Sequence, residues 1–222
     1  MADLLPLFPL PTVVLFPNVF LPLHVFEPRY REMVADALAG DHVIGMVLLR
    51  PGWEHDYDGR PPVYLVGCSG VITHFERLND GRYNIILRGV ERFRILGEDH
   101  GRSYRRARVD ALPETDAGPE DRAIVRALRA KLEALLAPAL QPQHAESRSG
   151  RAALGAVDLR GAAAMPDPDL VNALAQYLDL EPLEKQALLE QSCLRSRAQA
   201  LVELLEMKLM MAHTPGLSNT AH

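Results

Sequence analysis

The spacing of apolar residues changes once along the chain, near residue 113, and this change constrains the fold more than any other feature. Before it, short apolar runs alternate with Pro, Gly, Asn and Asp, which is typical of strands joined by tight turns. After it, apolar residues recur every three or four positions, as on one face of a helix. Residues 113–119, PETDAGP, have the composition of a linker. The sequence therefore predicts an α+β fold, with strands first and helices afterwards.

The first part, residues 1–112, predicts a closed or half-closed β-barrel with one early helix. The helix begins at Pro28, a residue that suits the first helical position, and stops at Gly40. Asn79-Asp80-Gly81 predicts a hairpin turn, and Arg88-Gly89 is expected to break a strand. Many short strands with tight turns favour a barrel. The expected strands are residues 13–16, 20–25, 43–49, 68–78, 83–87, 92–96 and 104–112.

The second part, residues 119–212, predicts a helical bundle followed by a frayed tail at 213–222. Each helix shows an apolar stripe, and acidic residues or prolines precede three of the four helices. Between the first two helices, residues 138–150 are polar and predict a loop. The expected helices are residues 119–137, a second from Asp167 with Leu170, Val171, Leu174, Tyr177 and Leu178 on its apolar face, 181–192 and 195–212.

Composition excludes several classes of function. The net charge of −5 argues against nucleic acid as the main partner, because phosphate binding needs a basic surface. No apolar run is long enough to span a membrane, and the proline-rich N-terminus makes a poor signal peptide. Cys68 and Cys193 lie far apart, as expected of reduced thiols. We expect a cytoplasmic protein with no membrane contact and no cofactor; the oligomeric state stays open.

Catalytic and metal motifs are missing as well. No glycine precedes any of the lysines, so the phosphate-binding loop of an ATPase is absent, and no lysine is placed to activate a serine. Glu54 and Asp56 could pair as acid and base, but no nucleophile accompanies them. His42, His55, Asp56 and Asp58 lack the spacing of metal ligands. We therefore expect no enzyme activity and no metal.

Two stretches carry a family resemblance. The opening LPLFPLPTVVLFPNVFLPLHVFEPRYREMVADAL and the later VYLVGCSGVITHFERLNDGRYNIILRGVERFRI are similar to the N-terminal, substrate-binding domain of Lon protease. LDLEPLEKQALLEQSCLRSRAQALVELL resembles its helical region, including Gln186, Leu189 and Arg197. The chain looks like a standalone bacterial-type member, distantly similar to cereblon, that lacks the ATPase and the Ser-Lys peptidase. The resemblance implies a PUA-like pseudobarrel followed by a helical bundle, and recognition of unfolded or degron-bearing polypeptides before proteolysis.

Aromatic residues are the candidate contacts with such a polypeptide. Trp53, the only tryptophan, lies in a predicted loop with Tyr57 and Tyr64 close in sequence, which suits peptide capture. Alternatively, Trp53 folds back as a lid on the barrel core. Phe20 and Phe26 are further candidates, although phenylalanines in this position also suit a core. The cleft between barrel and bundle is another place for a groove.

A cluster of arginines offers an alternative function. Arg102, Arg105, Arg106 and Arg108 form the densest basic stretch, and PUA-like barrels include RNA binders. In a strand, Arg106 and Arg108 would share one face and Arg105 the other, so no single basic stripe results. A solvated strand is the simpler interpretation, and an RNA-binding module that uses residues 102–108 is the alternative.

Overall fold

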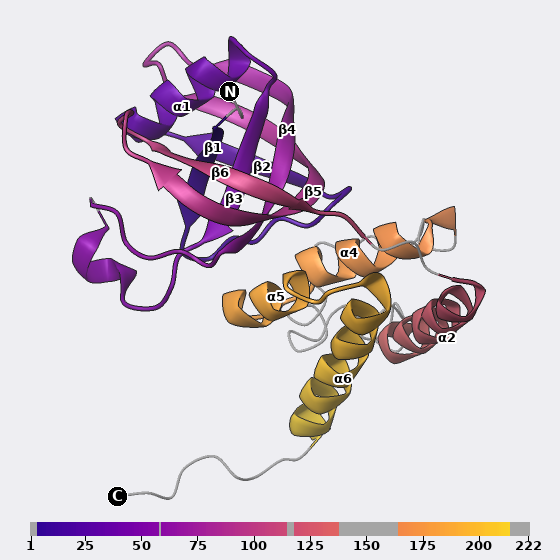
Figure 1. Ribbon diagram of the computed structural model, residues 1–222. Helices are drawn as coiled ribbons and strands as arrows, with labels where there is room; N and C mark the ends of the chain where they lie inside the picture. Colours follow the sequence, from indigo (N-terminus) through magenta and orange to yellow (C-terminus); the bar gives the residue numbers. More distant parts are fainter. Residues whose placement is uncertain (1–3, 58, 115–117, 138–163, 214–222) are drawn as a thin grey trace, which may run out of the picture.

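The computed structural model describes residues 4–57, 59–114, 118–137 and 164–213, in which strands come first and most helices follow (Figure 1). This order confirms the α+β class. The strands are β1 (Leu5–Leu10), β2 (Phe20–Val25), β3 (Val43–Leu48), β4 (Val66–Arg77), β5 (Tyr83–Asp99) and β6 (Arg105–Leu112). The helices are α1 (Pro28–Leu38), α2 (Pro119–Leu136), α4 (Asp167–Tyr177), α5 (Pro182–Leu189) and α6 (Leu194–His213), with a 3-10 turn, η1, at Trp53–Asp56.

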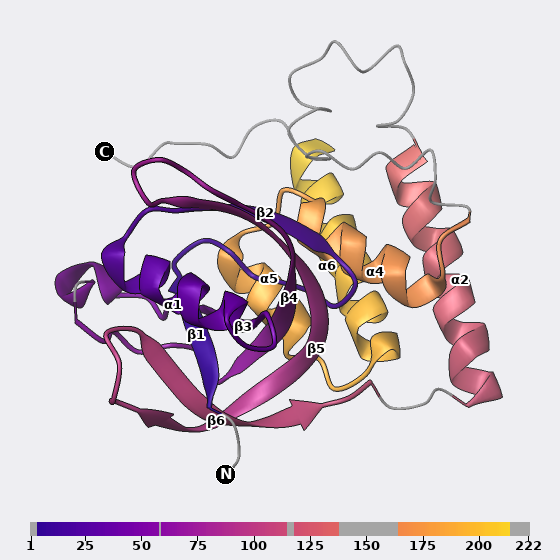
Figure 2. The ribbon, with the colours of Figure 1, turned by 90° about the horizontal axis from the view of Figure 1, so that it is seen from above.

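The strands form a sheet that closes on itself. Their order is β2-β5-β4-β3-β1-β6, and a further pairing of β5 with β6 completes a ring that leaves β2 outside. The long strand β5 makes this closure possible, because it pairs with β2 over Tyr83–Arg88 and with β6 over Arg92–Asp99, while β4 pairs with it from Tyr83 to Arg94. Figure 2 shows the curved strands from above, and α1 contacts β1 and β3. The ring fixes where α1 and the loops beside it lie.

The apolar run at residues 13–16 is not a strand, and the prediction there was wrong. The first strand is β1 instead, despite its prolines at positions 6 and 9. Pro11 and Pro17 flank the run and cannot donate to a strand partner. Phe16 is nevertheless fully buried, and its backbone N–H donates to Gln176 Oε1 in α4 at 3.2 Å. The run is therefore a buried connection whose backbone bonds to a helix.

Arg88-Gly89 does not break the strand either, since β5 continues through both residues. The Gly89 N–H donates to the Val19 carbonyl and the Gly89 carbonyl accepts from the Asn18 N–H, both at 2.9 Å. A Cβ at this position would lie 2.0 Å from the Phe16 carbonyl oxygen. Glycine is therefore needed for the close approach of a neighbouring segment rather than for a turn. The predicted turn at Asn79-Asp80-Gly81 does join β4 to β5.

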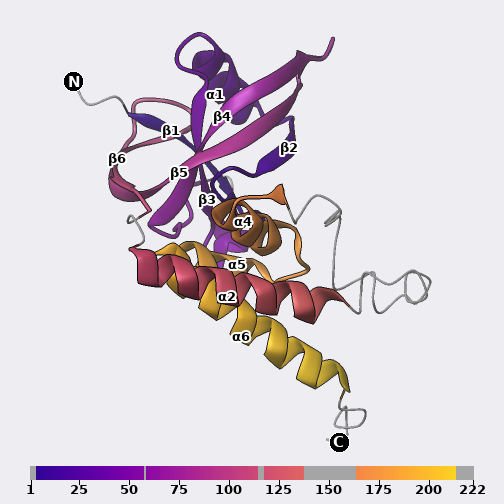
Figure 3. The same cartoon turned by 90° about the vertical axis from the view of Figure 1, so that its right-hand side faces the viewer.

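The helices follow the predicted apolar stripes. In α2 the buried residues are Val125, Leu128, Leu132 and Leu136. The predicted stripe of α4 is also buried or partly buried in the core. α5 ends at Leu189, earlier than the expected residue 192, and α6 ends at His213; residues 138–150 and 214–222 lie outside the described parts. α2 packs along α6 (Figure 3). Among the described helices, none has the length and apolar content needed to cross a bilayer.

Two apolar clusters fill the molecule. The larger is continuous from the strands and α1 into α2, α4, α5 and α6, so barrel and helices share one core. The smaller lies between β1, β3, β5 and β6 and consists of Leu7, Val47, Leu49, Val63, Phe93, Ile95 and Ala107. Because the larger cluster contains residues from both sides of the linker, the helices pack against the barrel and do not merely follow it in the chain.

Buried polar side chains join the barrel to the helices. Arg92 of β5 donates to the carbonyl oxygens of Leu189 and Ser192, at 3.0 and 3.3 Å, and to that of Gln191. These bonds explain why the chain turns after α5 instead of continuing as a helix. Gln186 of α5 donates to the Val66 carbonyl at 3.0 Å.

Arg197 of α6 completes this junction and is fully buried. It donates to Asn172 Oδ1 at 3.0 Å and to the Leu188 carbonyl at 3.2 Å. Arg92 Nε and Arg197 Nη2 face Glu114 Oε1 at 3.3 and 2.6 Å as ion pairs, without the alignment of hydrogen bonds. Burial lowers the pKa of Arg197, and Glu114 opposes this shift. We name Arg92, Glu114, Asn172, Gln186 and Arg197 the polar junction.

We expect Arg197→Met to lower the free energy of unfolding by about 3–5 kcal/mol, because it leaves buried groups of the polar junction without a partner. Arg197→Lys should restore little, since an ammonium cannot reproduce the planar fork of donors. Urea denaturation followed by circular dichroism measures the change. Arg195→Met is the matched control: its exposed pair with Asp121 should contribute no more than about 1 kcal/mol. Equal losses for the two variants would contradict a special role of the junction.

Candidate functional site

The edge strand β2 presents an exposed row of side chains that includes two predicted contact residues. Along β2, Phe20, Pro22 and His24 are exposed, while the residues between them turn toward the core. Phe26 continues the alternation just after the strand. Phe20 is 50% and Phe26 59% exposed, which is unusual for phenylalanine. We name Phe20, Pro22, His24 and Phe26 the β2 row.

The β2 row is held in place from two sides. β2 pairs with β5 from Phe20 opposite Arg88 to Val25 opposite Tyr83. At the start of the strand, the Tyr177 hydroxyl of α4 donates to the Phe20 carbonyl at 2.8 Å. Partial burial raises the pKa of Tyr177, so its hydroxyl stays a donor at neutral pH. The row is therefore an apolar strip on a fixed backbone. Pro22 has no backbone N–H, so it interrupts the row of hydrogen-bond donors along the open edge of the strand.

Trp53 and Tyr57 come together elsewhere, on the turn η1. Trp53 is half-buried against the smaller apolar cluster, and its ring meets that of Tyr57 edge to face at 5.4 Å. The Tyr57 hydroxyl donates to Glu27 Oε1 at 2.6 Å, and Arg29 donates to the Tyr57 carbonyl at 3.1 Å. Burial and the bond to Glu27 raise the pKa of Tyr57. This geometry favours Trp53 as a cover over the cluster rather than as a free contact residue.

Tyr64 is separate from both places. It is partly buried against the larger core, and the Arg50 guanidinium lies 5.3 Å from the centre of its ring. The predicted aromatic contacts thus lie in three places: the β2 row, Trp53 with Tyr57, which we name the η1 pair, and Tyr64. The junction between barrel and helices, the other predicted position of a groove, is filled by the polar junction and the larger core.

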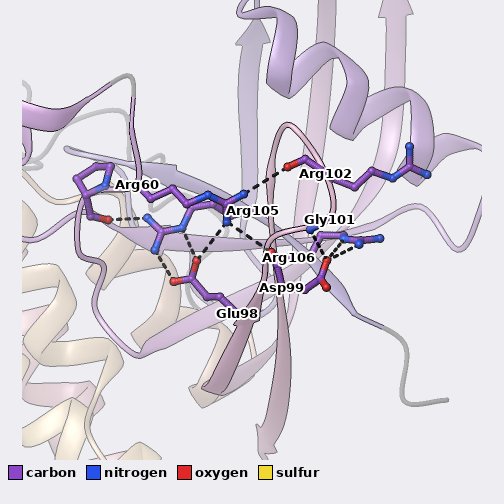
Figure 4. Close-up of polar contacts among 8 residues, drawn as sticks. Arg60, Glu98, Asp99, Gly101, Arg102, Arg105 and Arg106 are labelled. Carbon is purple, nitrogen blue, oxygen red and sulfur yellow. Dashed lines mark hydrogen bonds and ion pairs between the residues drawn. The ribbon is translucent and has the colours of Figure 1, made fainter.

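The arginines of the alternative function are mostly paired with carboxylates, and Figure 4 shows the pairs of Arg105 with Glu98 and of Arg106 with Asp99. Arg105 is buried; its Nε donates to Glu98 Oε2 at 2.9 Å and its Nη2 to Glu98 Oε1. Arg106 pairs with Asp99. Arg108 is exposed on the same strand.

Arg102, from the loop before β6, meets two acids of α1, Glu32 and Asp36, at 3.6 Å each. Phosphate binding needs uncompensated positive charge. The pairing of these arginines therefore does not favour an RNA surface.

A pocket of about 180 Å³ lies beside these arginines, and the sequence did not predict it. It is lined by Arg29, Tyr30, Gly59, Arg60, Ser103, Tyr104 and Arg105. We name it the arginine pocket. Its residues come from α1, the loop after η1, and the loop before β6 with the first residue of that strand, which the closed ring brings together. No spacing in the sequence could have indicated it.

Within the described residues, no three His, Cys, Asp or Glu side chains gather as a metal site would require. Glu54, His55 and Asp56 are exposed on η1, and Asp58 lies outside the described residues. Burial raises the pKa of the Cys68 thiol to about 12, which makes it a poor nucleophile.

Comparison with known proteins gives a consistent relationship. Residues 4–207 match the family model of the ATP-dependent protease La (LON) substrate-binding domain. Lon protease 2 of Myxococcus xanthus is 29% identical over 206 residues, which are 93% of this chain and 24% of that protein. Lon protease of Paraburkholderia phytofirmans is 32% identical over 189 residues, 83% of this chain and 22% of that protein. The chain thus spans about a quarter of the length of these relatives.

Solved structures agree on the fold. The N-terminal domain of a Mycobacterium avium complex Lon protease superposes with a TM-score of 0.66 at 18% identity, over 92% of this chain and 98% of that one. A Lon N-terminal domain protein from Xanthomonas campestris gives a TM-score of 0.55 at 24% identity, over 96% and 99%. These structures show the same fold, and the family model, which covers nearly the whole described fold, shows that the chain belongs to the Lon substrate-binding domain family.

Proposed function

We propose that this chain binds unfolded or degron-bearing polypeptides through the β2 row and takes no catalytic part in their degradation. The family supports a substrate-binding role in proteolysis. The observation that carries the proposal is the exposure of Phe20 and Phe26 on one fixed strip, since exposed aromatics rimmed by polar groups mark binding surfaces. His24, bonded to Asn84 at 2.7 Å, supplies such a polar group.

The η1 pair and Tyr64 are proposed as secondary contacts. Trp53 and Tyr57 keep part of their surface accessible, and Tyr64 is also only partly buried. Their packing limits what they can offer to a ligand without rearrangement. We further propose that residues 1–112 form a PUA-like barrel subdomain and residues 119–212 a bundle subdomain, and that the protein works in the cytoplasm.

We expect Phe20→Ala combined with Phe26→Ala to weaken binding of reduced, carboxymethylated lactalbumin about tenfold or more, because aromatic anchors contribute most of the energy at such surfaces. Fluorescence anisotropy of the labelled polypeptide measures the affinity. Leu96→Ala is the matched control, because Leu96 is 57% exposed on the far half of β5. Unchanged affinity in the double variant, or an equal loss in the control, would contradict the β2 row as the site.

We expect Trp53→Ala to lower the free energy of unfolding by about 1–2 kcal/mol, less than for a fully buried tryptophan because Trp53 is half-buried. Trp53→Phe should recover part of this loss. Urea denaturation followed by circular dichroism measures both. Polypeptide affinity at a temperature where both variants are folded should change less than twofold; a larger loss in Trp53→Phe would make the η1 pair a primary contact.

We expect the purified chain to leave casein intact with or without ATP, because neither a phosphate-binding loop nor an activated serine is present in its sequence. Gel electrophoresis over several hours checks this. Degradation that survives repeated purification would overturn the non-catalytic part of the proposal.

A further inference from the structure

The arginine pocket brings together three guanidinium groups from distant parts of the sequence. Arg29, Arg60 and Arg105 all line it, and no Asp or Glu is among its lining residues. The other lining side chains, Tyr30, Ser103 and Tyr104, carry hydroxyl groups. The hydroxyls of Ser103 and Tyr104 already donate to Glu32 and Asp36, so the donors that face the pocket come from the arginines and Tyr30, and they select a ligand that brings acceptors.

Each of these arginines is already oriented by the protein. Arg105 is held by Glu98 and donates to the Pro61 carbonyl at 2.5 Å. Arg60 donates to the carbonyls of Asp99 and Arg102, at 3.4 and 3.3 Å. Such side chains lose little conformational freedom when a ligand binds, which favours affinity.

Arg29 is held in the same way, by Glu27 at 3.0 Å and by the Tyr57 carbonyl. Donor groups remain nevertheless: Arg29 Nη1 and Arg60 Nε have no hydrogen-bond partner among the residues that the structure describes. The pocket therefore combines fixed geometry with spare donors.

Tyr30 gives the independent observation. The residue is only 3% exposed, and it lines the pocket. Its hydroxyl forms no hydrogen bond with any described residue, whereas the Tyr104 hydroxyl donates to Asp36 and that of Ser103 to Glu32. Burial raises the pKa of Tyr30 to about 12, so the hydroxyl keeps its proton and remains a donor. Among the described residues, the sealed side-chain atoms without a hydrogen bond are Arg92 Nε and Arg197 Nη2, so the Tyr30 hydroxyl is open to the pocket, where a ligand can meet it.

The charges around the pocket decide which acceptor fits. Arg29 and Arg105 are each compensated by one carboxylate, Glu27 and Glu98, while Arg60 lies 4.0 Å from Glu98 and is held chiefly by carbonyl groups. Arg102 nearby faces two acids of α1. Counted with Arg102, four arginines at the pocket face four carboxylates, so the pocket carries little net charge, which suits a singly charged carboxylate better than a doubly charged phosphate.

We propose that the arginine pocket binds a carboxylate of the bound polypeptide, from its C-terminus or from an Asp or Glu side chain. This inference rests on the proposed function. Arg29 follows Phe26 by three residues, so their Cα atoms lie within about 11 Å of each other. A polypeptide that contacts the β2 row at Phe26 therefore reaches the pocket with few further residues.

The test uses the full chain and three forms of one labelled twelve-residue peptide that contains two phenylalanines. One form has a free C-terminus, one is amidated, and one is amidated with a glutamate at the penultimate position. We expect either carboxylate form to bind about tenfold more tightly than the plain amide, because a hydrogen bond to a charged group changes the affinity by at least about this factor. The stronger of the two carboxylate forms identifies the source.

Two variants assign the effect to the pocket. Tyr30→Phe removes one hydroxyl oxygen, and Arg60→Gln removes a partly exposed side chain held mainly by carbonyl groups, so both should fold. Each should reduce the preference for carboxylate to threefold or less, while Arg195→Gln, a change at an exposed arginine of α6 paired with Asp121, should keep it. Circular dichroism checks that the variants are folded.

The outcomes separate the two proposals. Equal binding of all three peptide forms would overturn the carboxylate site and leave the polypeptide-binding function standing. If no form binds, sodium acetate and sodium phosphate are titrated at constant ionic strength, with the arginine Nε resonances followed by NMR. Shifts of these resonances with acetate that are smaller in Tyr30→Phe would then support the carboxylate site but not the polypeptide-binding function. Shifts with phosphate only, or with neither anion, would overturn it.

Discussion

The polar junction between barrel and helices is the interaction on which the rest of the structure depends. Arg92 connects β5 to the end of α5 and the turn that follows it, and Gln186 connects α5 to β4. Arg197 connects α6 to Asn172 of α4 and to Glu114. Buried charges are costly unless nearly all of their donors are met, so this junction tolerates one arrangement of the helices. That arrangement brings Tyr177 to the start of β2 and so fixes the edge of the sheet.

Ring closure has the second large effect. Because β5 pairs with β6 as well as with β4, the loop before β6 comes to lie beside α1 and the segment after η1. The arginine pocket is made of these three segments. The same closure leaves β2 outside the ring as an edge strand, with no strand on its open side and with Phe20, Pro22 and His24 exposed. One topological feature thus underlies both the open edge at the β2 row and the assembly of the arginine pocket.

Much of the fold was predictable because periodicity records burial directly. The helices α1, α2 and α4 and the strands β3 and β6 agree with their apolar patterns. The errors have a common cause: a proline or glycine was interpreted by its local preference. β1 was not predicted because it contains prolines. Gly89 predicted a break in the strand, whereas it is a glycine because the backbone of a neighbouring segment lies too close for a side chain. Local preferences do not contain such long-range contacts.

The sequence by itself determined the order of strands and helices, the apolar faces and the family signature, because these depend on residues close together in the chain. Only the tertiary structure decided which aromatic residues are exposed and which arginines are neutralised. Phe26 and Trp53 are both aromatic residues outside the expected strand cores, yet one extends into solvent and the other covers an apolar cluster. The difference arises from partners far away in sequence, and ring closure alone brings those partners into contact.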